Sequence, residues 1–152
     1  MNIQKTKYYH EILRLGFDLL TIYWALFKVT TIGVRVMVEH NGKVLLIKHS
    51  YRKGYHFPGG GVRRAEEFDH AGIREVFEET GLVIDKLQLV SVYRDFLENK
   101  NNCVLIYRVG SVINPHELKA DGIEIIEAIW VDPQKPPEEA SYFTKQALAS
   151  LF

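Results

Sequence analysis

Four glutamates with fixed spacing are the side chains of this 152-residue chain best suited to chemistry. Glu75, Glu78 and Glu79 stand at i, i+3 and i+4, so a helix presents them on one face. Glu66 precedes Glu75 by nine residues, on the expected first turn. Like charges on one face repel unless a cation neutralises them, and Mg²⁺ and Mn²⁺ prefer carboxylate oxygens. The spacing therefore predicts a divalent-metal site, with a solvated acidic helix face as the alternative.

The residues around these glutamates complete a longer pattern. Its defined positions are Gly60, Glu66, Arg74-Glu75, Val76, Glu78-Glu79, Gly81 and Leu82. This 23-residue segment resembles the signature of the Nudix hydrolases with every defined position filled, and the preceding Phe57-Pro58-Gly59-Gly60-Gly61 is similar to the usual approach to it. The resemblance implies a Nudix-type α/β/α sandwich with a mixed β-sheet.

The resemblance also implies an activity and a cofactor. Nudix hydrolases cleave a diphosphate linkage in a nucleoside diphosphate joined to another group, and a divalent metal, Mg²⁺ or Mn²⁺, neutralises the phosphates and activates a water. A small-molecule nucleotide is therefore the expected substrate. One alternative is a nucleotide or ADP-ribose sensor that does not hydrolyse its ligand, which we expect to have lost glutamates that this chain retains. Another is a structural or membrane-docked partner protein.

Metal binding is assigned by the resemblance to the acidic residues of the segment. The implied ligands are Glu75, Glu78 and Glu79, with Glu66 and the backbone carbonyls of Gly59 and Gly60 as further candidates. All three helix glutamates are candidates for the general base, and the resemblance does not choose between them. Glu66 has an alternative role, which is to cap and orient the helix.

Two further residues are expected beside these ligands. Arg74 orients one of the glutamates through its planar guanidinium, and a plain surface ion pair is the alternative. Family members often add an acidic residue from a later loop or strand, for which the candidates are Asp121, Glu124 and Glu127. We favour Glu124 because it lies six residues before Trp130, although an exposed strand residue could have the same position.

Substrate contacts are expected from the basic and aromatic stretch before the glycine-rich approach. Arginines there can bind phosphate, and aromatic rings can stack on a base. The candidates in this stretch are Tyr51, Arg52 and Phe57, and the first expected strand adds Arg35. The residues after the signature carry none of the usual markers for ADP-ribose, dinucleoside polyphosphate or NADH, so the sequence does not identify the substrate.

Composition narrows the class of protein. Nineteen basic residues balance nineteen acidic ones, so no overall positive field favours a nucleic-acid partner. The single cysteine, Cys103, excludes an internal disulfide and fits a reducing compartment, which predicts a cytoplasmic location.

The N-terminal segment is unusual for a surface helix. From Ile12 to Lys28 a helical pattern has one narrow polar stripe, and the apolar arc is wider than one packing face needs. We expect a docking helix (residues 1–30) that contacts its own domain and a second subunit, followed by a Nudix hydrolase domain (31–152). A peripheral membrane contact is the alternative. A membrane-spanning helix is disfavoured because the run contains Arg14 and Asp18.

The rest of the chain alternates between strand and helix patterns. Asn41-Gly42 predicts a type I′ hairpin turn, and Gly81 predicts the end of the helix that carries the glutamates. The expected strands are 31–40, 43–49, 83–97, 102–111 and 123–131, and the expected helices are 65–80 and 138–150.

Overall fold

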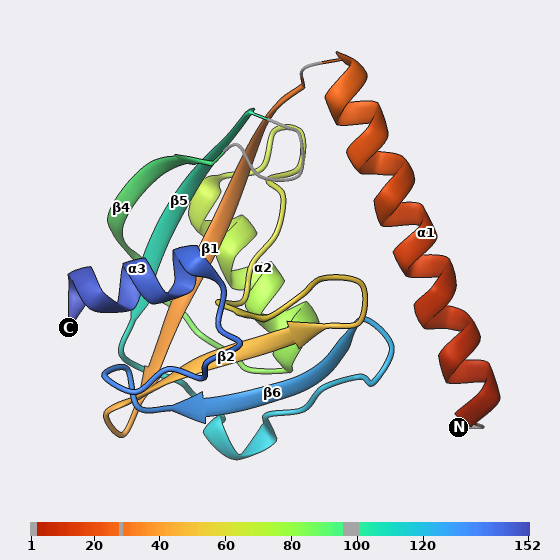
Figure 1. Ribbon diagram of the computed structural model, residues 1–152. Coiled ribbons are helices and arrows are strands. Elements are labelled where there is room, and N and C mark those ends of the chain that lie inside the picture. Colours follow the sequence, from red (N-terminus) through yellow and green to blue (C-terminus); the bar gives the residue numbers. More distant parts are fainter. Residues whose placement is uncertain (1–2, 28, 96–100) are drawn as a thin grey trace.

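The computed structural model describes residues 3–27, 29–95 and 101–152 (Figure 1). In chain order the elements are α1 (Ile3–Phe27), β1 (Thr30–His40), β2 (Lys43–His49), β3 (Tyr55–His56), α2 (Phe68–Thr80), β4 (Gln88–Asp95), β5 (Asn101–Val109), a 3-10 turn (Pro115–Glu117), β6 (Ile125–Val131) and α3 (Tyr142–Leu151).

The six strands form one mixed sheet with a helix on each face. The order is β3-β2-β1-β5-β4, and β6 pairs with β2. β1 and β5 run parallel, whereas the other pairs are antiparallel. The expected α/β/α Nudix sandwich is confirmed.

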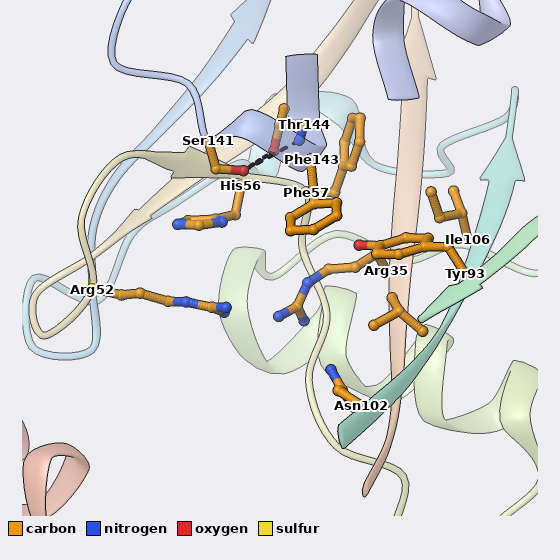
Figure 2. Close-up of a pocket in the computed structure, with 11 residues that line it drawn as sticks. Arg35, Arg52, His56, Phe57, Tyr93, Asn102, Ile106, Ser141, Phe143 and Thr144 are labelled. Atoms are coloured by element: carbon orange, nitrogen blue, oxygen red, sulfur yellow. Dashed lines mark hydrogen bonds between the residues drawn. The ribbon is translucent and has the colours of Figure 1, made fainter. Parts of the chain in front are cut away.

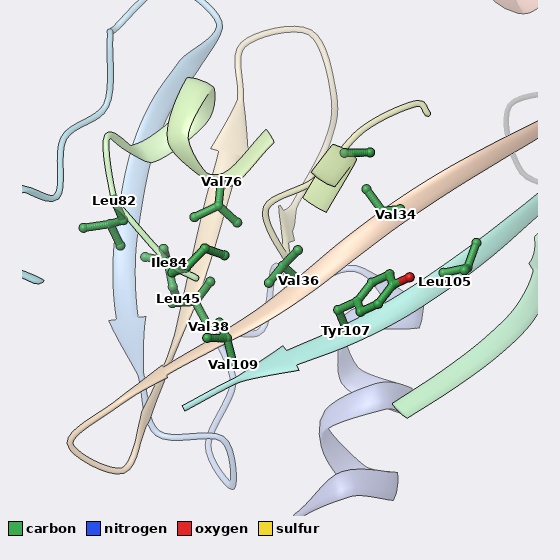
Figure 3. Packing of buried hydrophobic residues seen from close by; sticks show 11 residues of the cluster. Val34, Val36, Val38, Leu45, Val76, Leu82, Ile84, Leu105, Tyr107 and Val109 are labelled. Atoms are coloured by element: carbon green, nitrogen blue, oxygen red, sulfur yellow. The ribbon is translucent and has the colours of Figure 1, made fainter. Parts of the chain in front are cut away.

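Alternation along β1 divides the core into two layers. Val34, Val36 and Val38 are fully buried on the side of α2, where they meet residues of β5 (Figure 3). Met37 packs on the other side, in a cluster with Leu148 of α3. Successive strand residues point to opposite faces, so one strand supports both helices and positions the loops between them.

Two turn predictions are confirmed by backbone geometry. Asn41 and Gly42 have φ of 50° and 72°, as a type I′ turn requires. Gly81 has φ of 71°, and its N–H donates to the carbonyl of Phe77 at the end of α2.

The helix that carries the glutamates begins later than expected. Ala65 has φ of 59°, so the backbone is left-handed where the helix was predicted to start. Glu66 accepts a hydrogen bond from the Arg63 N–H, and α2 starts at Phe68. Glu66 therefore belongs to the loop before α2, and its predicted place on the first turn is wrong. Phe77 of α2 is 57% exposed, although it is a large apolar residue next to the buried Val76.

Other boundaries also differ from the predictions. β6 begins at Ile125 because the Asp121 carboxylate accepts three successive backbone N–H groups and holds the preceding residues in a turn. α3 begins at Tyr142, after Ser141 caps it by accepting from the Thr144 N–H. β4 spans only 88–95, and the expected strand end at Leu97 lies outside the described residues.

α1 begins at Ile3, nine residues before the helical pattern that starts at Ile12, and lies along one side of the domain (Figure 1). Its inward side includes His10, whose Nε2 donates to the Gly122 carbonyl at 2.9 Å, and Phe17, whose ring lies 5.1 Å from that of Tyr51. The opposite side exposes many large apolar residues. Within the described part of the chain, no helix has the length and apolar character needed to cross a membrane.

Candidate active site

Arg74 of α2 binds three of the predicted acidic residues at once. Its Nε and Nη2 donate to both carboxylate oxygens of Glu66, at 2.7 and 3.0 Å. Its Nη1 donates to Glu75 at 2.6 Å and to Glu78 at 3.0 Å. The hydrogen bond from Arg74 is the main reason that the pKa of Glu66 falls to about 2. The guanidinium fork thus holds the three carboxylates close to one another.

Glu79 differs from the other glutamates because it is buried, with only 9% of its surface exposed. One carboxylate oxygen accepts from the Gly59 N–H at 2.7 Å, and the other lies 3.7 Å from Nε2 of His49. Burial raises the pKa of Glu79 to about 8, although the Gly59 hydrogen bond and Arg35 oppose the rise. Burial also lowers the pKa of His49 to about 3, so this imidazole is neutral at pH 7.

The glycine-rich approach to α2 lies against the glutamates and β1. A Cβ on Gly60 would lie 2.6 Å from the Glu75 carboxylate, so only glycine leaves this carboxylate in place. The Gly60 carbonyl accepts from the Val34 N–H, and the Gly59 carbonyl accepts from the Arg35 guanidinium. Both predicted carbonyl ligands are therefore already hydrogen-bonded to β1 residues.

The later acidic residues have different surroundings. Glu124 accepts a hydrogen bond from the Tyr51 hydroxyl at 3.0 Å and faces the same cavity as Glu75 and Glu79. Asp121 holds the turn before β6, as described above. Glu127 accepts from the hydroxyl of Tyr55 at 2.6 Å instead. Of the three candidates, the favoured Glu124 is the one whose carboxylate both faces the cavity and is held by a predicted substrate residue.

Two of the cavities in the described part of the chain adjoin the carboxylates of α2. A polar cavity of about 250 Å³ is lined by Glu75, Glu78, Glu79, Glu124, Asp121, Ile125, Arg63 and Arg74. A larger one, of about 380 Å³, shares Glu75, Glu79 and Glu124 and adds three predicted substrate residues, Arg35, Arg52 and Tyr51.

Phe57 is the predicted substrate residue that lies elsewhere. It is 3% exposed within the core and lines a small neighbouring cavity of about 40 Å³ (Figure 2). Arg35 and Arg52 line this small cavity and also the larger cavity beside the carboxylates. Their guanidinium groups extend toward the same region from opposite sides (Figure 2).

The sequence reasoning missed several residues that line the larger cavity. α1 contributes Phe17, Leu20 and Trp24, and β5 contributes Asn102. Phe17 and Trp24 are seven residues apart, so they lie on the same side of the helix. An apolar pattern alone does not show that this side faces a binding site.

The donor set fits a hard divalent cation, although it is not arranged as a metal site. Within residues 3–27, 29–95 and 101–152, no three His, Cys, Asp or Glu side chains are placed to hold a metal ion. Arg74 and Arg63 instead bind the carboxylates of Glu66, Glu75 and Glu78. The raised pKa of the buried Glu79 shows that its negative charge is poorly compensated, and a cation beside it would supply that compensation.

Known proteins with similar sequences and structures were compared with this chain. A diphosphoinositol polyphosphate phosphohydrolase (3-alpha) from Mus musculus is 30% identical over 118 residues, which cover 72% of each chain. A Bacillus subtilis protein, provisionally named an 8-oxo-dGTP diphosphatase, is 37% identical over 87 residues, which cover 57% of this chain. The match spans only 51%, about half, of that relative's length.

A similar solved structure is that of a MutT Nudix hydrolase from Burkholderia pseudomallei. It superposes with a TM-score of 0.74 at 21% identity and covers 82% of this chain and 99% of its own. At this identity the likeness shows the fold alone. The family model described as the NUDIX domain matches residues 28–151, which include every element except α1. The chain therefore belongs to the Nudix family.

Proposed function

We propose that the chain is a Mg²⁺-dependent pyrophosphohydrolase, for which Mn²⁺ can substitute. Its substrate is a nucleoside diphosphate linked to another group, and hydrolysis breaks the diphosphate linkage. The observation that carries the proposal is the larger cavity, where Glu75, Glu79 and Glu124 face the same space as Arg35 and Arg52. Such a cavity places acidic groups for catalysis beside cations that bind an anionic substrate.

Each of these residues has a distinct proposed role. When bound to the carboxylates, Mg²⁺ would neutralise phosphate oxygens and supply an activated water. Arg35 and Arg52 hold the phosphates from two sides, and Arg74 keeps Glu75 in position. Glu79 is buried, and its carboxylate is held by the Gly59 N–H beside His49, which makes it a candidate general base alongside the other glutamates.

A nucleotide sensor without hydrolysis is the second candidate function. The observation that favours it is the pairing of Glu66, Glu75 and Glu78 with arginines, which leaves no ready metal cluster among the described residues. A sensor would use the same cavity and the same arginines but would leave the diphosphate intact.

Phosphate release from a nucleotide panel tests the proposal. ADP-ribose, nucleotide sugars, dinucleoside polyphosphates and oxidised nucleoside triphosphates are incubated with the wild type, Glu79→Gln and the exposed control Glu67→Gln, with Mg²⁺ or Mn²⁺. Loss of the buried carboxylate is expected to lower turnover about 10³-fold, within the range for groups that transfer protons at a reaction centre. Glu67→Gln is expected to retain wild-type turnover. Binding without hydrolysis by the wild type would favour the sensor.

We also propose that residues 1–30 form a self-association segment beside the hydrolase domain of residues 31–152. Six apolar residues of α1 are between 47 and 73% exposed, and they follow alternating spacings of four and three: Tyr8, Ile12, Leu15, Leu19, Ile22 and Leu26. All of them lie on the outward face except Ile12, which also borders a cavity beside Tyr51. This spacing is that of a helix seam whose partner is another helix, and a second copy of α1 supplies a matching one. Glu11 and Asp18 offset much of the basic charge of the helix, which disfavours an anionic membrane as the occupant.

Analytical ultracentrifugation of the full chain tests this contact. The wild type and Arg14→Glu, which lies off the seam, are expected to sediment as dimers. Leu19→Lys, at the middle of the seam, is expected to sediment as a monomer. A monomeric wild type that floats with liposomes, and loses this property in Leu19→Lys, would show that lipid covers this face instead.

A further inference from the structure

The larger cavity has two chemically different walls. Phe17, Leu20 and Trp24 of α1 form an apolar wall, and the carboxylates of α2 lie on another side. Its volume of about 380 Å³ lies within the range of small-molecule sites, about 300–1,000 Å³. The reacting end of a ligand and its remaining part can therefore meet different surfaces in one cavity.

Aromatic rings connect the apolar wall with the carboxylates. The centroid of Phe17 lies 6.3 Å from that of Trp24, edge to face, and 5.1 Å from that of Tyr51. Tyr51 lies 5.2 Å from His49, which adjoins Glu79. Rings at these distances make a surface on which a further planar ring can stack, either offset or edge to face.

The neighbouring aromatic group does not offer the same space. Tyr93 and Phe143 are stacked on each other, with centroids 5.1 Å apart and planes at 14°. With Phe57 they line the cavity of about 40 Å³ (Figure 2), which suits a few water molecules rather than a base. The larger cavity beside the carboxylates, in contrast, combines an aromatic lining with room for a planar ligand.

Polar groups on the β1 and β5 side indicate what kind of planar ligand fits. Asn102 is 93% buried, and its Oδ1 accepts from the Thr31 hydroxyl at 2.9 Å, which fixes the amide beside the cavity. A base edge can hydrogen-bond with such groups, whereas an isoprenyl chain would bury them without compensation. Arg35 and Arg52 are the only basic residues other than His49 among those that line the described cavity, too few to match the many phosphates of an inositol polyphosphate.

We propose that α1 supplies the base-binding wall of the site: the base of the substrate lies against Trp24 and Phe17, opposite Asn102, while its diphosphate lies between Arg35 and Arg52. This inference rests on the proposed function for the identity of the diphosphate end. The substrate class that it names is a nucleoside diphosphate derivative with an accessible planar base. Trp24 then determines affinity for the base and does not take part in bond cleavage.

Trp24 itself supplies a readout that does not depend on turnover. The chain has two tryptophans, so Trp130→Phe leaves Trp24 as the single tryptophan emitter. This variant is kept free of metal with EDTA and excited at wavelengths longer than those that nucleotides absorb. It is titrated with two nucleotides, ADP-ribose and dGTP, and with two diphosphates that lack a base, 5-phosphoribosyl diphosphate and farnesyl diphosphate. The nucleotides are expected to quench Trp24 emission, and 5-phosphoribosyl diphosphate is not. No quenching by nucleotides, or quenching by farnesyl diphosphate alone, would overturn the proposal.

Calorimetry on matched variants adds a second test. Trp24→Leu keeps an apolar side chain, and Tyr23→Leu changes an aromatic residue that is 50% exposed and does not line the cavity. Trp24→Leu is expected to weaken nucleotide binding about 5- to 150-fold, the range for loss of one base–aromatic stack, and to leave 5-phosphoribosyl diphosphate unaffected. Equal weakening of both ligands, or an equal effect of Tyr23→Leu, would contradict a base-specific wall.

The two proposals can fail separately. If nucleotides quench Trp24 but the wild type with Mg²⁺ hydrolyses none of them, the base-binding wall stands and the hydrolase function fails. If nucleotides are hydrolysed with the same KM by the wild type and Trp24→Leu, the hydrolase function stands and the wall is refuted.

Discussion

α2 and α1 both border the larger cavity, but the domain holds them in different ways. α2 places Ala71 and Val76 in the core, fully buried, and its charged side is bound together by Arg74. α1 contributes to neither buried cluster of the described residues, and its contacts with the domain include the Phe17–Tyr51 ring pair and a hydrogen bond from His10. The contrast indicates that reacting groups need the fixed geometry of a core, whereas a wall that contacts the non-reacting part of a ligand can be added from outside.

Among the changes that test how α2 is held, the largest effect is expected where the backbone touches the α2 carboxylates. Gly60→Ala would place a Cβ 2.6 Å from the Glu75 carboxylate and displace it, whereas Gly61→Ala meets nothing within 4 Å. We expect Gly60→Ala to lower kcat/KM about 10- to 100-fold, as for other changes that reorient a ligand from behind. Gly61→Ala is the matched control in the same assay. Equal activity of the two variants would show that Glu75 does not need its position.

A smaller effect is expected on stability when the α2 network loses its cation. Arg74→Met leaves Glu66, Glu75 and Glu78 facing one another without their shared partner. Urea denaturation is expected to show a loss of about 1–3 kcal/mol in the free energy of unfolding. Arg64→Met, on the exposed loop before α2, is the control and is expected to unfold like the wild type. If Arg74→Met has the same urea midpoint as the wild type, the ion pairs of Arg74 do not contribute to the stability of the fold.

The smallest effect is expected from acid. The pKa of Glu66 is lowered to about 2, chiefly by Arg74, so its carboxylate stabilises the fold above its ordinary pKa and loses this contribution as pH falls toward 2. Urea midpoints measured between about pH 5 and pH 3 should therefore fall less steeply in Glu66→Gln than in the wild type. Glu67→Gln, which is exposed, should keep the wild-type slope. If the urea midpoint of Glu66→Gln falls with decreasing pH as steeply as that of the wild type, the Glu66–Arg74 ion pair does not stabilise the fold.

The same contrast explains what the sequence could predict. Local rules located the Asn41-Gly42 turn, β2 and the Gly81 helix end, because each depends on a few neighbouring residues. The i, i+3, i+4 spacing also placed the glutamates on one side of α2. It did not show that Glu79 is buried while the side chain of Glu78 is 47% exposed, because burial depends on β1 and the approaching loop.

Features that depend on tertiary contacts were missed. The left-handed backbone at Ala65 delays the start of α2, and no residue type at that position signals it. Phe77 is exposed because it lies about 100° around the helix from the buried Val76, at the edge of the packed side. In α1 apolar residues occur almost all round, so the pattern could not show that Phe17 and Trp24 face the cavity and Leu19 faces away.

The central claim is that α2 carries the reacting groups and that α1 binds the base. Steady-state kinetics of two variants on one hydrolysed nucleotide test this claim most directly. Glu79→Gln is expected to lower kcat about 10³-fold with KM within a few-fold of the wild type, because it removes a group that acts on the reacting atoms. Trp24→Leu is expected to raise KM about 5- to 150-fold with kcat nearly unchanged, because it removes binding shared by ground and transition states. A fall in kcat alone for Trp24→Leu, or wild-type kcat for Glu79→Gln, would contradict the account.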